Sequence, residues 1–165
     1  MSHTRAGLFP ARREEYGDDV RGRLEAATKV ELGEYLAAAA DRQRLRAGFA
    51  RLFREADLLL TPVGAGPPAP IGEDRVVHLG REIEFRELVM SYTVPQDLAG
   101  LPACAFRAGF DSLGIPVGVQ LTGPPWAEAR VLQAAQAFFE ATPETQSRRP
   151  ELSGSAGSDG RGERT

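Results

Sequence analysis

The sequence predicts an α/β fold in which helices flank a mixed β-sheet, and three observations carry the prediction. Residues from about 28 to 55 place apolar side chains at helical spacing. A short apolar run at 57–61 has the length and composition of a strand, and so do 103–107 and 115–122, which a Gly-containing turn joins. A second amphipathic segment at 127–141 predicts a helix that packs against those strands.

The first long helix is predicted from its start signal and its period. Thr28 and Glu31 have the spacing of a capping box, in which each side chain bonds the backbone N–H of the other residue. Apolar residues then recur near a period of 3.6 at Tyr35, Ala38, Ala39, Leu45, Phe49, Leu52 and Phe53. We expect the helix to begin at Thr28 and to end near Glu55.

The run Asp57-Leu-Leu-Leu-Thr61 is continuously apolar at its centre and is followed by Pro62. This pattern suits an interior strand that is buried on both faces of a sheet. Residues 62–80 are rich in Pro and Gly, which predicts an extended loop, and the next helix is expected at 82–92.

The turn at 109–114 predicts that its two flanking strands pair as an antiparallel hairpin. After Pro143 the composition shifts to Ser, Gly, Arg and Glu, which cannot bury enough apolar surface to offset the entropy of ordering. We therefore expect one folded portion over 1–142 and a disordered tail over 143–165.

Composition restricts the partners and the compartment. The 165 residues carry a net charge of −3, which provides no electrostatic attraction to nucleic acid or to an anionic membrane surface. Five arginines lie within residues 42–54, and acidic residues are interleaved through the surrounding chain, so we interpret the arginines as a solvated helix face. Cys104 is the only cysteine and no apolar run is long enough to span a bilayer, so a cytoplasmic location is expected.

Residue types that could carry catalysis are present but poorly placed. The motif Gly154-Ser-Ala-Gly-Ser158 lies in the predicted tail, and Lys29, the only lysine, lies among glutamates that disfavour its deprotonation. Cys104 sits in an apolar strand, where a free cysteine is usually a small core residue, and His3 and His78 are far from each other in the sequence. We therefore assign no catalytic, metal-binding or cofactor-binding residue.

An ordered series of turns and strands between Pro95 and Pro125 resembles the C-terminal third of amidase signature enzymes. Asp97 to Ala103 reads Asp-Leu-Ala-Gly-Leu-Pro-Ala, and Gly114 to Leu121 reads Gly-Ile-Pro-Val-Gly-Val-Gln-Leu. Weaker similarities upstream extend the resemblance to about residues 5–141: Tyr16 to Arg23, the helix with Tyr35 and Arg42, and Asp57 to Pro62.

The resemblance implies part of a large mixed β-sheet flanked by helices, incomplete in this chain, and hydrolysis of carboxylic amides by a Ser–cis-Ser–Lys triad. In the family that triad lies upstream of this region, so no residue here inherits a catalytic role. The loop from Pro62 to Pro70 and the segment from Met90 to Gln96 are the expected pocket contributors. Gln96-Asp97 replaces the Val-Asn of the glutamine-using tRNA amidotransferases. The position that corresponds to an acidic, substrate-binding residue of that branch falls near Met90. The departure from the Val-Asn pattern favours a general amidase.

Two interpretations remain open at this point. The chain is either the C-terminal fragment of an amidase, inactive unless an N-terminal amidase fragment supplies the triad, or a non-catalytic binding or structural module derived from one. The first implies a polypeptide partner, and both allow self-association through exposed sheet edges. Neither involves nucleic acid or a membrane.

Overall fold

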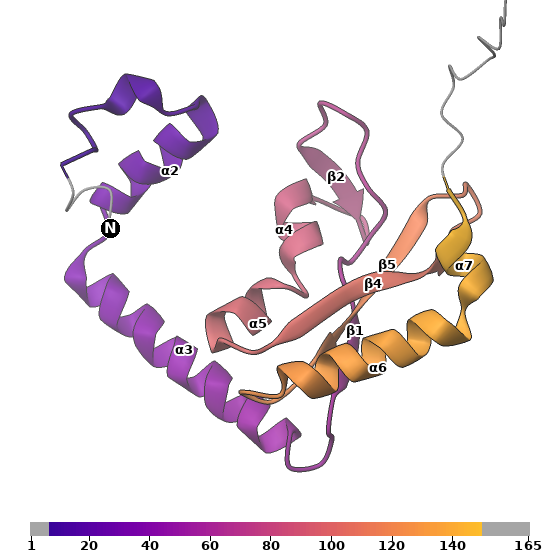
Figure 1. Cartoon of the computed structure of the whole chain (residues 1–165). Coiled ribbons are helices and arrows are strands. Elements are labelled where there is room, and N and C mark those ends of the chain that lie inside the picture. Colours follow the sequence, from indigo (N-terminus) through magenta and orange to yellow (C-terminus); the bar gives the residue numbers. More distant parts are fainter. Residues whose placement is uncertain (1–6, 150–165) are drawn as a thin grey trace, which may run out of the picture. The chain divides into compact units, whose positions relative to one another are not determined.

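The computed structural model describes residues 7–149. The chain divides into two compact units, Met1–Arg51 and Leu52–Thr165. Figure 1 colours the chain along its sequence and labels the helices and strands. The first unit is helical, and the second carries the strands.

The first unit contains the 3₁₀ turn η1 (Arg13–Glu15) and the helices α2 (Asp18–Thr28) and α3 (Leu32–Leu52). The predicted start of the long helix at Thr28 is wrong, because the Thr28 hydroxyl donates to the Glu25 carbonyl at the end of α2. The N–H of Glu31 instead donates to the carboxylate of Glu34 at 2.9 Å. The contact from Glu31 to Glu34 is one half of a capping box, three residues after the predicted position. Helix α2, which ends at Thr28, was not predicted.

The second unit is built on a three-stranded sheet with the order β1-β5-β4. The strands are β1 (Leu59–Pro62), β4 (Ala103–Phe110) and β5 (Pro116–Thr122), and both pairings are antiparallel. The predicted β4–β5 hairpin is confirmed. Its turn is fixed by Asp111, whose carboxylate accepts the N–H groups of Leu113 at 2.9 Å and Ile115 at 2.8 Å.

Strand β1 differs from its prediction in position and burial. It pairs with β5 alone among the described residues, so it is an edge strand of this sheet. Its residues alternate between half-buried and exposed, and Leu60 is 64% exposed. Although its sequence is continuously apolar, β1 is therefore exposed at alternate residues and unpaired along one edge within the described part of the chain.

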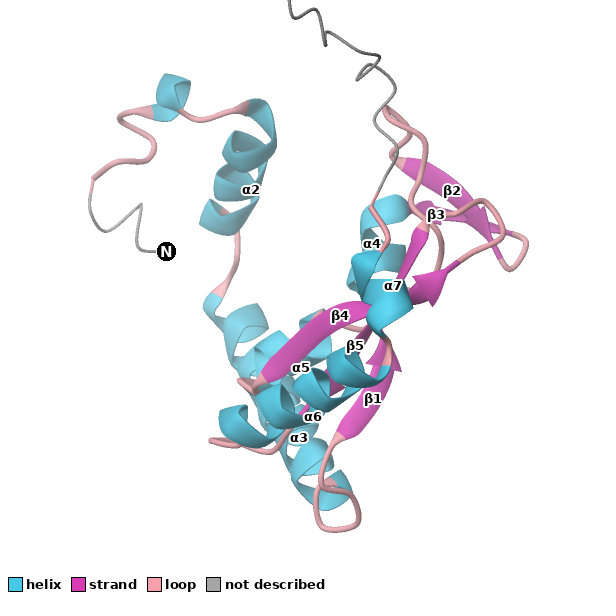
Figure 2. Ribbon diagram, turned by 45° about the vertical axis from the view of Figure 1, so that its right-hand side comes forward, coloured by secondary structure: helices cyan, strands magenta, loops and turns pink. Residues whose placement is uncertain are grey.

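One face of the sheet is covered by α6 (Glu128–Ala141), as predicted for residues 127–141. Figure 2 shows α6 lying along β4 and β5. The rings of Phe106 and Phe138 pack with centroids 5.0 Å apart, and Val131 is 2% exposed. A Cβ on Gly123 would lie 2.7 Å from a methyl of Val131, so the helix approaches the sheet over a bare backbone.

On the face of the sheet opposite to α6, the side chain of Gln120 makes polar contacts. Side chains of a strand alternate between the two faces of the sheet, and Phe106 pairs with Val119. The side chain of Gln120 therefore lies on the other face of the sheet from those of Val119 and Phe106. Gln120 is 3% exposed, and its amide nitrogen donates to the Thr61 hydroxyl at 3.1 Å and to the carbonyl of Tyr92. This contact joins the sheet to the chain between α4 (Phe85–Met90) and α5 (Val94–Ala99).

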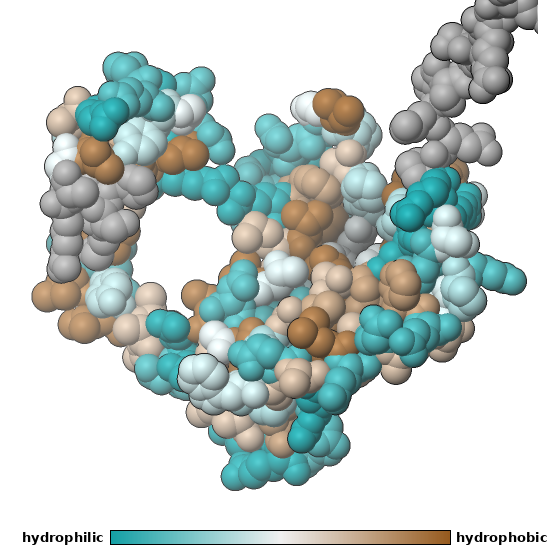
Figure 3. Space-filling model, in the orientation of Figure 1, coloured by the Kyte–Doolittle hydropathy of each residue, from teal (hydrophilic) through white to brown (hydrophobic). Residues whose placement is uncertain are grey.

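A second, two-stranded sheet pairs β2 (Arg75–His78) with β3 (Arg81–Glu84), where the sequence predicts a loop and the start of a helix. The two turn residues, Leu79 and Gly80, have φ of 49° and 75°. Such a turn is commonly Asn-Gly or Asp-Gly, so Leu-Gly gave no hairpin signal. Val77 and Leu79 of this hairpin are exposed. Figure 3 shows that hydrophobic and hydrophilic residues are intermixed on the visible surface of the second unit.

Helical structure continues past the predicted domain boundary at residue 142 as α7 (Pro143–Ser147). The rest of the predicted tail, including the Gly154–Ser158 motif, lies outside the described residues apart from Arg148 and Arg149. Within residues 7–149, no helix is both long enough and apolar enough to cross a membrane.

Candidate functional site

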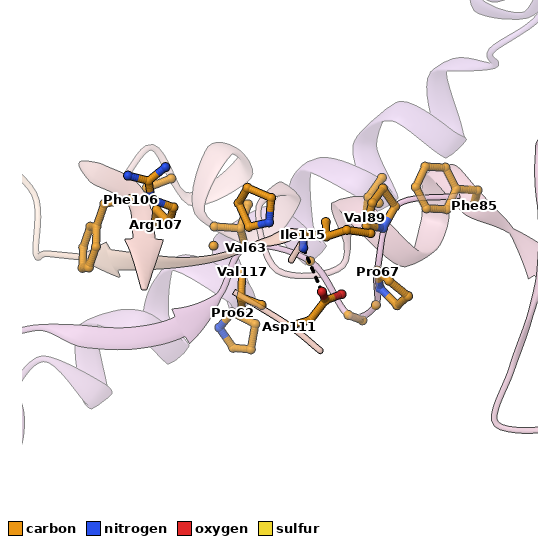
Figure 4. Close-up of a pocket in the computed structure, with 17 residues that line it drawn as sticks. Pro62, Val63, Pro67, Phe85, Val89, Phe106, Arg107, Asp111, Ile115 and Val117 are labelled. Carbon is orange, nitrogen blue, oxygen red and sulfur yellow. Dashed lines mark hydrogen bonds between the residues drawn. The ribbon is translucent and has the colours of Figure 1, made fainter. Parts of the chain in front are cut away.

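The second unit contains a cavity of about 860 Å³ beside the sheet. Its walls come from the loop after β1, from α4, and from the β4–β5 hairpin (Figure 4). The lining residues are Pro62 to Pro68, Phe85, Val89, Ala105, Phe106, Arg107, Asp111 and Ile115 to Gly118. Aliphatic, aromatic and proline side chains predominate, which is the usual composition of a site for an apolar group.

Figure 4 shows Phe106 and Arg107 at one end of the cavity and Phe85 and Val89 at the other, with Ile115 between them. Three segments far apart in sequence therefore enclose one space. The strand pairing β1-β5-β4 explains this, because it brings the end of β1 beside the hairpin. The N–H of Val63 continues the pairing by donating to the carbonyl of Gly118 at 3.2 Å.

The loop follows α4 closely because its glycines leave room for that helix. A Cβ on Gly66 would lie 2.9 Å from a methyl of Leu88, which is buried in α4. The N–H of Ala65 donates to the carbonyl of Leu88 at 3.3 Å. The sequence Pro-Val-Gly-Ala-Gly-Pro-Pro thus lets the backbone of this wall lie directly against α4.

Asp111 and Arg107 are the ionisable residues of this lining, and both are held by hydrogen bonds. The Asp111 carboxylate accepts two backbone N–H groups in the hairpin turn. The Arg107 guanidinium donates to the carbonyl of Gln146 at 2.8 Å and to that of Arg148 at 3.3 Å. Both side chains thus bond the protein's own backbone, while the Nε of Arg107 is buried without a partner among the described residues, and the rest of the lining is apolar.

The segment from Met90 to Gln96 was also expected to contribute to a pocket, but it lines a different one. Met90, Ser91, Val94 and Pro95, with Glu84, Arg86 and Glu87, surround a shallower space of about 630 Å³. Gln96 is 6% exposed, and its side-chain oxygen has no hydrogen-bond partner among the described residues. The structure therefore separates the two predicted pocket segments.

None of the described residues considered for catalysis is part of the cavity lining. Lys29 is exposed at the end of α2, Cys104 is half-buried in β4, and His78 belongs to β2. His3 and Ser155 fall outside the described residues. Across residues 7–149 no three His, Cys, Asp or Glu side chains are grouped so that they could hold a metal ion.

Sequence reasoning missed Arg107, Asp111 and Val89 as lining residues. A signal existed for Asp111, because Asp at the start of a Ser-Leu-Gly turn commonly accepts backbone N–H groups. Arg107 and Val89 gave none, because their positions depend on which distant segments pack against β4 and α4.

Comparison with known proteins decides the family. The family model described as Amidase matches residues 3–132 of this chain. The chain belongs to the amidase family. Its fold agrees, since a crystal structure described as an amidase superposes with a TM-score of 0.74 at 29% identity, over 84% of this chain and 31% of that one.

The amidase relatives with curated names differ in activity. A glutamyl-tRNA(Gln) amidotransferase subunit of Thermus thermophilus is 42% identical over 141 residues, which cover 82% of this chain and 28% of the relative. Fatty acid amide hydrolase of Medicago truncatula is 33% identical over 133 residues, which cover 80% of this chain and 22% of the relative. The chain thus spans about a quarter of the length of these relatives. They confirm the family resemblance, and the similar amidase crystal structure confirms the α/β fold class.

Proposed function

We propose that this chain is the C-terminal portion of a carboxylic amide hydrolase and supplies its acyl-side pocket. The observation that carries the proposal is the cavity of about 860 Å³, which an amidase-family segment lines with apolar side chains. In this proposal no described residue is catalytic. The nucleophile and base come from a region with the Ser–cis-Ser–Lys triad, and the chain is inactive without it.

The chemistry of the lining favours an amide of an apolar acid as the substrate. Free glutamine as a substrate carries an α-ammonium and an α-carboxylate, and both need a polar partner in a closed site. The two charged residues of the lining are occupied by the protein's own backbone. An aryl or alkyl acyl group needs only apolar contact, which supports a general amidase rather than a glutamine-using amidotransferase.

The proposed partner is an N-terminal amidase fragment, with self-association as the alternative. Strand β1 has no strand on its second side among the described residues, and Leu60 is exposed on it. An unpaired edge beside apolar side chains is a surface on which another strand can add. The single cysteine, Cys104, supports the cytoplasm as the proposed location.

A non-catalytic binding module is the second candidate, and the same cavity supports it. An apolar cavity can hold a ligand without any chemistry, so the cavity alone does not separate the two functions. The difference lies in whether a triad-bearing polypeptide restores hydrolysis. Ligand binding and amide hydrolysis therefore have to be measured in the same samples.

The test measures binding and hydrolysis of aryl and alkyl amides by the chain alone and by the chain mixed with the product of the adjacent upstream reading frame. Val89→Arg places a cation in the cavity wall and is expected to abolish both binding and hydrolysis. Val77→Arg, at a position on β2 that is 77% exposed and outside the cavity lining, is the matched control and should change neither.

Hydrolysis by the mixture only, lost in Val89→Arg and kept in Val77→Arg, is the expected result. Hydrolysis by the chain alone would refute the claim that the catalytic groups come from elsewhere. Binding that Val89→Arg abolishes, with no hydrolysis in any mixture, would favour the binding module. Binding that Val89→Arg leaves intact would show that the cavity is not the site.

A further inference from the structure

Arg107 lines the cavity, and its guanidinium is bound by α7 and the residue that follows it. One of its terminal nitrogens donates to the carbonyl of Gln146 at 2.8 Å and the other to the carbonyl of Arg148 at 3.3 Å. The side chain of Gln146 returns the contact, because its nitrogen donates to the backbone carbonyl of Arg107 at 3.1 Å. The strand and the short helix are thus joined by reciprocal hydrogen bonds.

Further contacts hold α7 in this position. The Gln146 side-chain nitrogen also donates to the Thr142 hydroxyl at 3.2 Å, and that hydroxyl donates to the carbonyl of Phe138 at 2.8 Å. The guanidinium of Arg148 lies 4.1 Å from the ring centroid of Phe110, which the guanidinium of Arg107 also approaches at 5.1 Å. The cation–π contact of Arg148, the residue that follows α7, therefore adds to the hydrogen bonds between this segment and the hairpin.

The contacts with α7 decide what Arg107 presents to the cavity. With its terminal nitrogens bonded to two carbonyls, the guanidinium has partners of its own and contributes its apolar stem to the wall. Without α7 the same cation would face an apolar space with its donors unpaired. A guanidinium in that condition binds a carboxylate through charge-assisted hydrogen bonds.

We propose that Arg107 is a specificity-determining residue and that the docked helix α7 sets its preference for neutral over anionic ligands. This inference rests on the proposed function, because it assumes that the cavity takes the acyl part of an amide. Docked α7 favours the neutral amide over the carboxylate that its hydrolysis releases. The helix lies beyond residues 3–132, which match the family, so this control belongs to the part of the chain outside that match.

The test compares two ligands that differ only in the group at issue, 4-phenylbutanamide and 4-phenylbutanoate. Binding of each to the full chain is measured by isothermal titration calorimetry. Gln146→Ala with Arg148→Ala removes the side chains that dock α7 and leaves Arg107 in place. Gln133→Ala with Arg149→Ala removes the same residue types from exposed positions and is the matched control.

Two further variants test whether the effect acts through the cation. Arg107→Lys and Arg107→Met are each combined with the undocking pair. Lysine keeps a positive charge at this position, whereas methionine keeps the apolar stem alone. A merely structural role of Arg107 would make these two combinations behave alike towards both ligands.

We expect the wild type and the control to bind the amide more tightly than the carboxylate. The undocked variant should shift the ratio of dissociation constants towards the carboxylate by about tenfold or more, the size of one charge-assisted hydrogen bond. When Arg107→Lys is combined with the undocking pair, most of that shift should remain. When Arg107→Met is combined with the same pair, the shift should disappear. Hydrogen exchange at residues 143–147 should rise in the undocked variants only.

An unchanged ratio in the undocked variant, in a chain whose wild type binds the amide, would overturn this inference and leave the proposed function standing. A shift that survives Arg107→Met would also overturn it, because another group would then bind the carboxylate. A wild type that binds neither ligand would overturn both the inference and the apolar cavity on which the proposed function depends.

Discussion

The contact between Gly123 and Val131 gives a prediction whose size follows from the structure. Gly123→Ala adds a Cβ that would lie 2.7 Å from a methyl of Val131 and 3.3 Å from the Cβ of Ala127. Both neighbours belong to the start of α6 or its cap, which is held against β5. Because Val131 is buried and cannot move aside freely, the added methyl must displace the helix from the sheet.

Overpacking of this kind costs about 1–3 kcal/mol in the free energy of unfolding. Val131→Ala removes two buried methyl groups, which is about 1.6 kcal/mol of transfer free energy before any cavity term. In the double variant the methyl added at position 123 enters the space that Val131 vacates. We therefore expect the double variant to be more stable than the sum of the single effects predicts, by about 1 kcal/mol or more.

Urea unfolding followed by circular dichroism at 222 nm measures all four members of this cycle. Gly109→Ala is the control, since an added Cβ at that position in β4 meets nothing within 4 Å. Additive effects of Gly123→Ala and Val131→Ala would refute the reasoning, because they would mean that the two groups do not share one space. A cost of Gly109→Ala as large as that of Gly123→Ala would show that any glycine in this sheet is needed for its backbone alone.

Four other predictions concern separate features. Gly100 ends α5 with φ of 72° and open space around it, so Gly100→Ala should cost about 1–2 kcal/mol in urea unfolding, from backbone strain alone. Gln120→Leu leaves two part-buried acceptors without a donor and should cost about 1–3 kcal/mol in the same assay, whereas a neutral effect would show that water replaces the amide. Leu60→Lys should reduce self-association of the chain in analytical ultracentrifugation, and a wild type that is already monomeric would contradict an exposed adhesive edge. The hydrogen bond from Arg12 lowers the pKa of Glu15, so this carboxylate stabilises the folded state above its unfolded pKa and loses that effect as the pH falls through its folded pKa. Arg12→Ala should raise the pKa of Glu15 in a carboxyl NMR titration. An unchanged pKa would contradict the pairing of these two residues.

The elements that the sequence predicted well are those whose signals are local. The β4–β5 hairpin has a Gly-containing turn between two apolar runs, and α6 has an uninterrupted amphipathic period. The β2–β3 hairpin was missed because its turn is Leu79-Gly80, where Leu adopts a positive φ that its side chain disfavours. The start of α3 was misplaced because Thr28 has a cap spacing but bonds backwards to α2.

The candidate site was predictable only in part, for a physical reason. The loop from Pro62 to Pro70 was expected from the family resemblance, and its first seven residues do line the cavity. The opposite wall, with Arg107 and Val89, depends on strand order and helix placement, which are long-range properties. The docking of α7 was hidden further, because the composition after Pro143 predicts disorder. Two side chains, those of Gln146 and Arg148, hold that segment through partners about 40 residues away in the sequence.

The two outer strands of the three-stranded sheet are in different situations, and this asymmetry bears on assembly. Strand β4 is engaged by α7 through the carbonyl and side chain of Arg107. Strand β1 pairs with β5 alone among the described residues, and its apolar Leu60 is 64% exposed. Since the chain spans 28% of its amidotransferase relative, we expect a triad-bearing polypeptide to add its strand at β1 and not at β4. Crosslinking from a cysteine at position 60, with the natural Cys104 replaced by serine, would capture that polypeptide, whereas capture from position 108 alone would reverse the assignment of the edges.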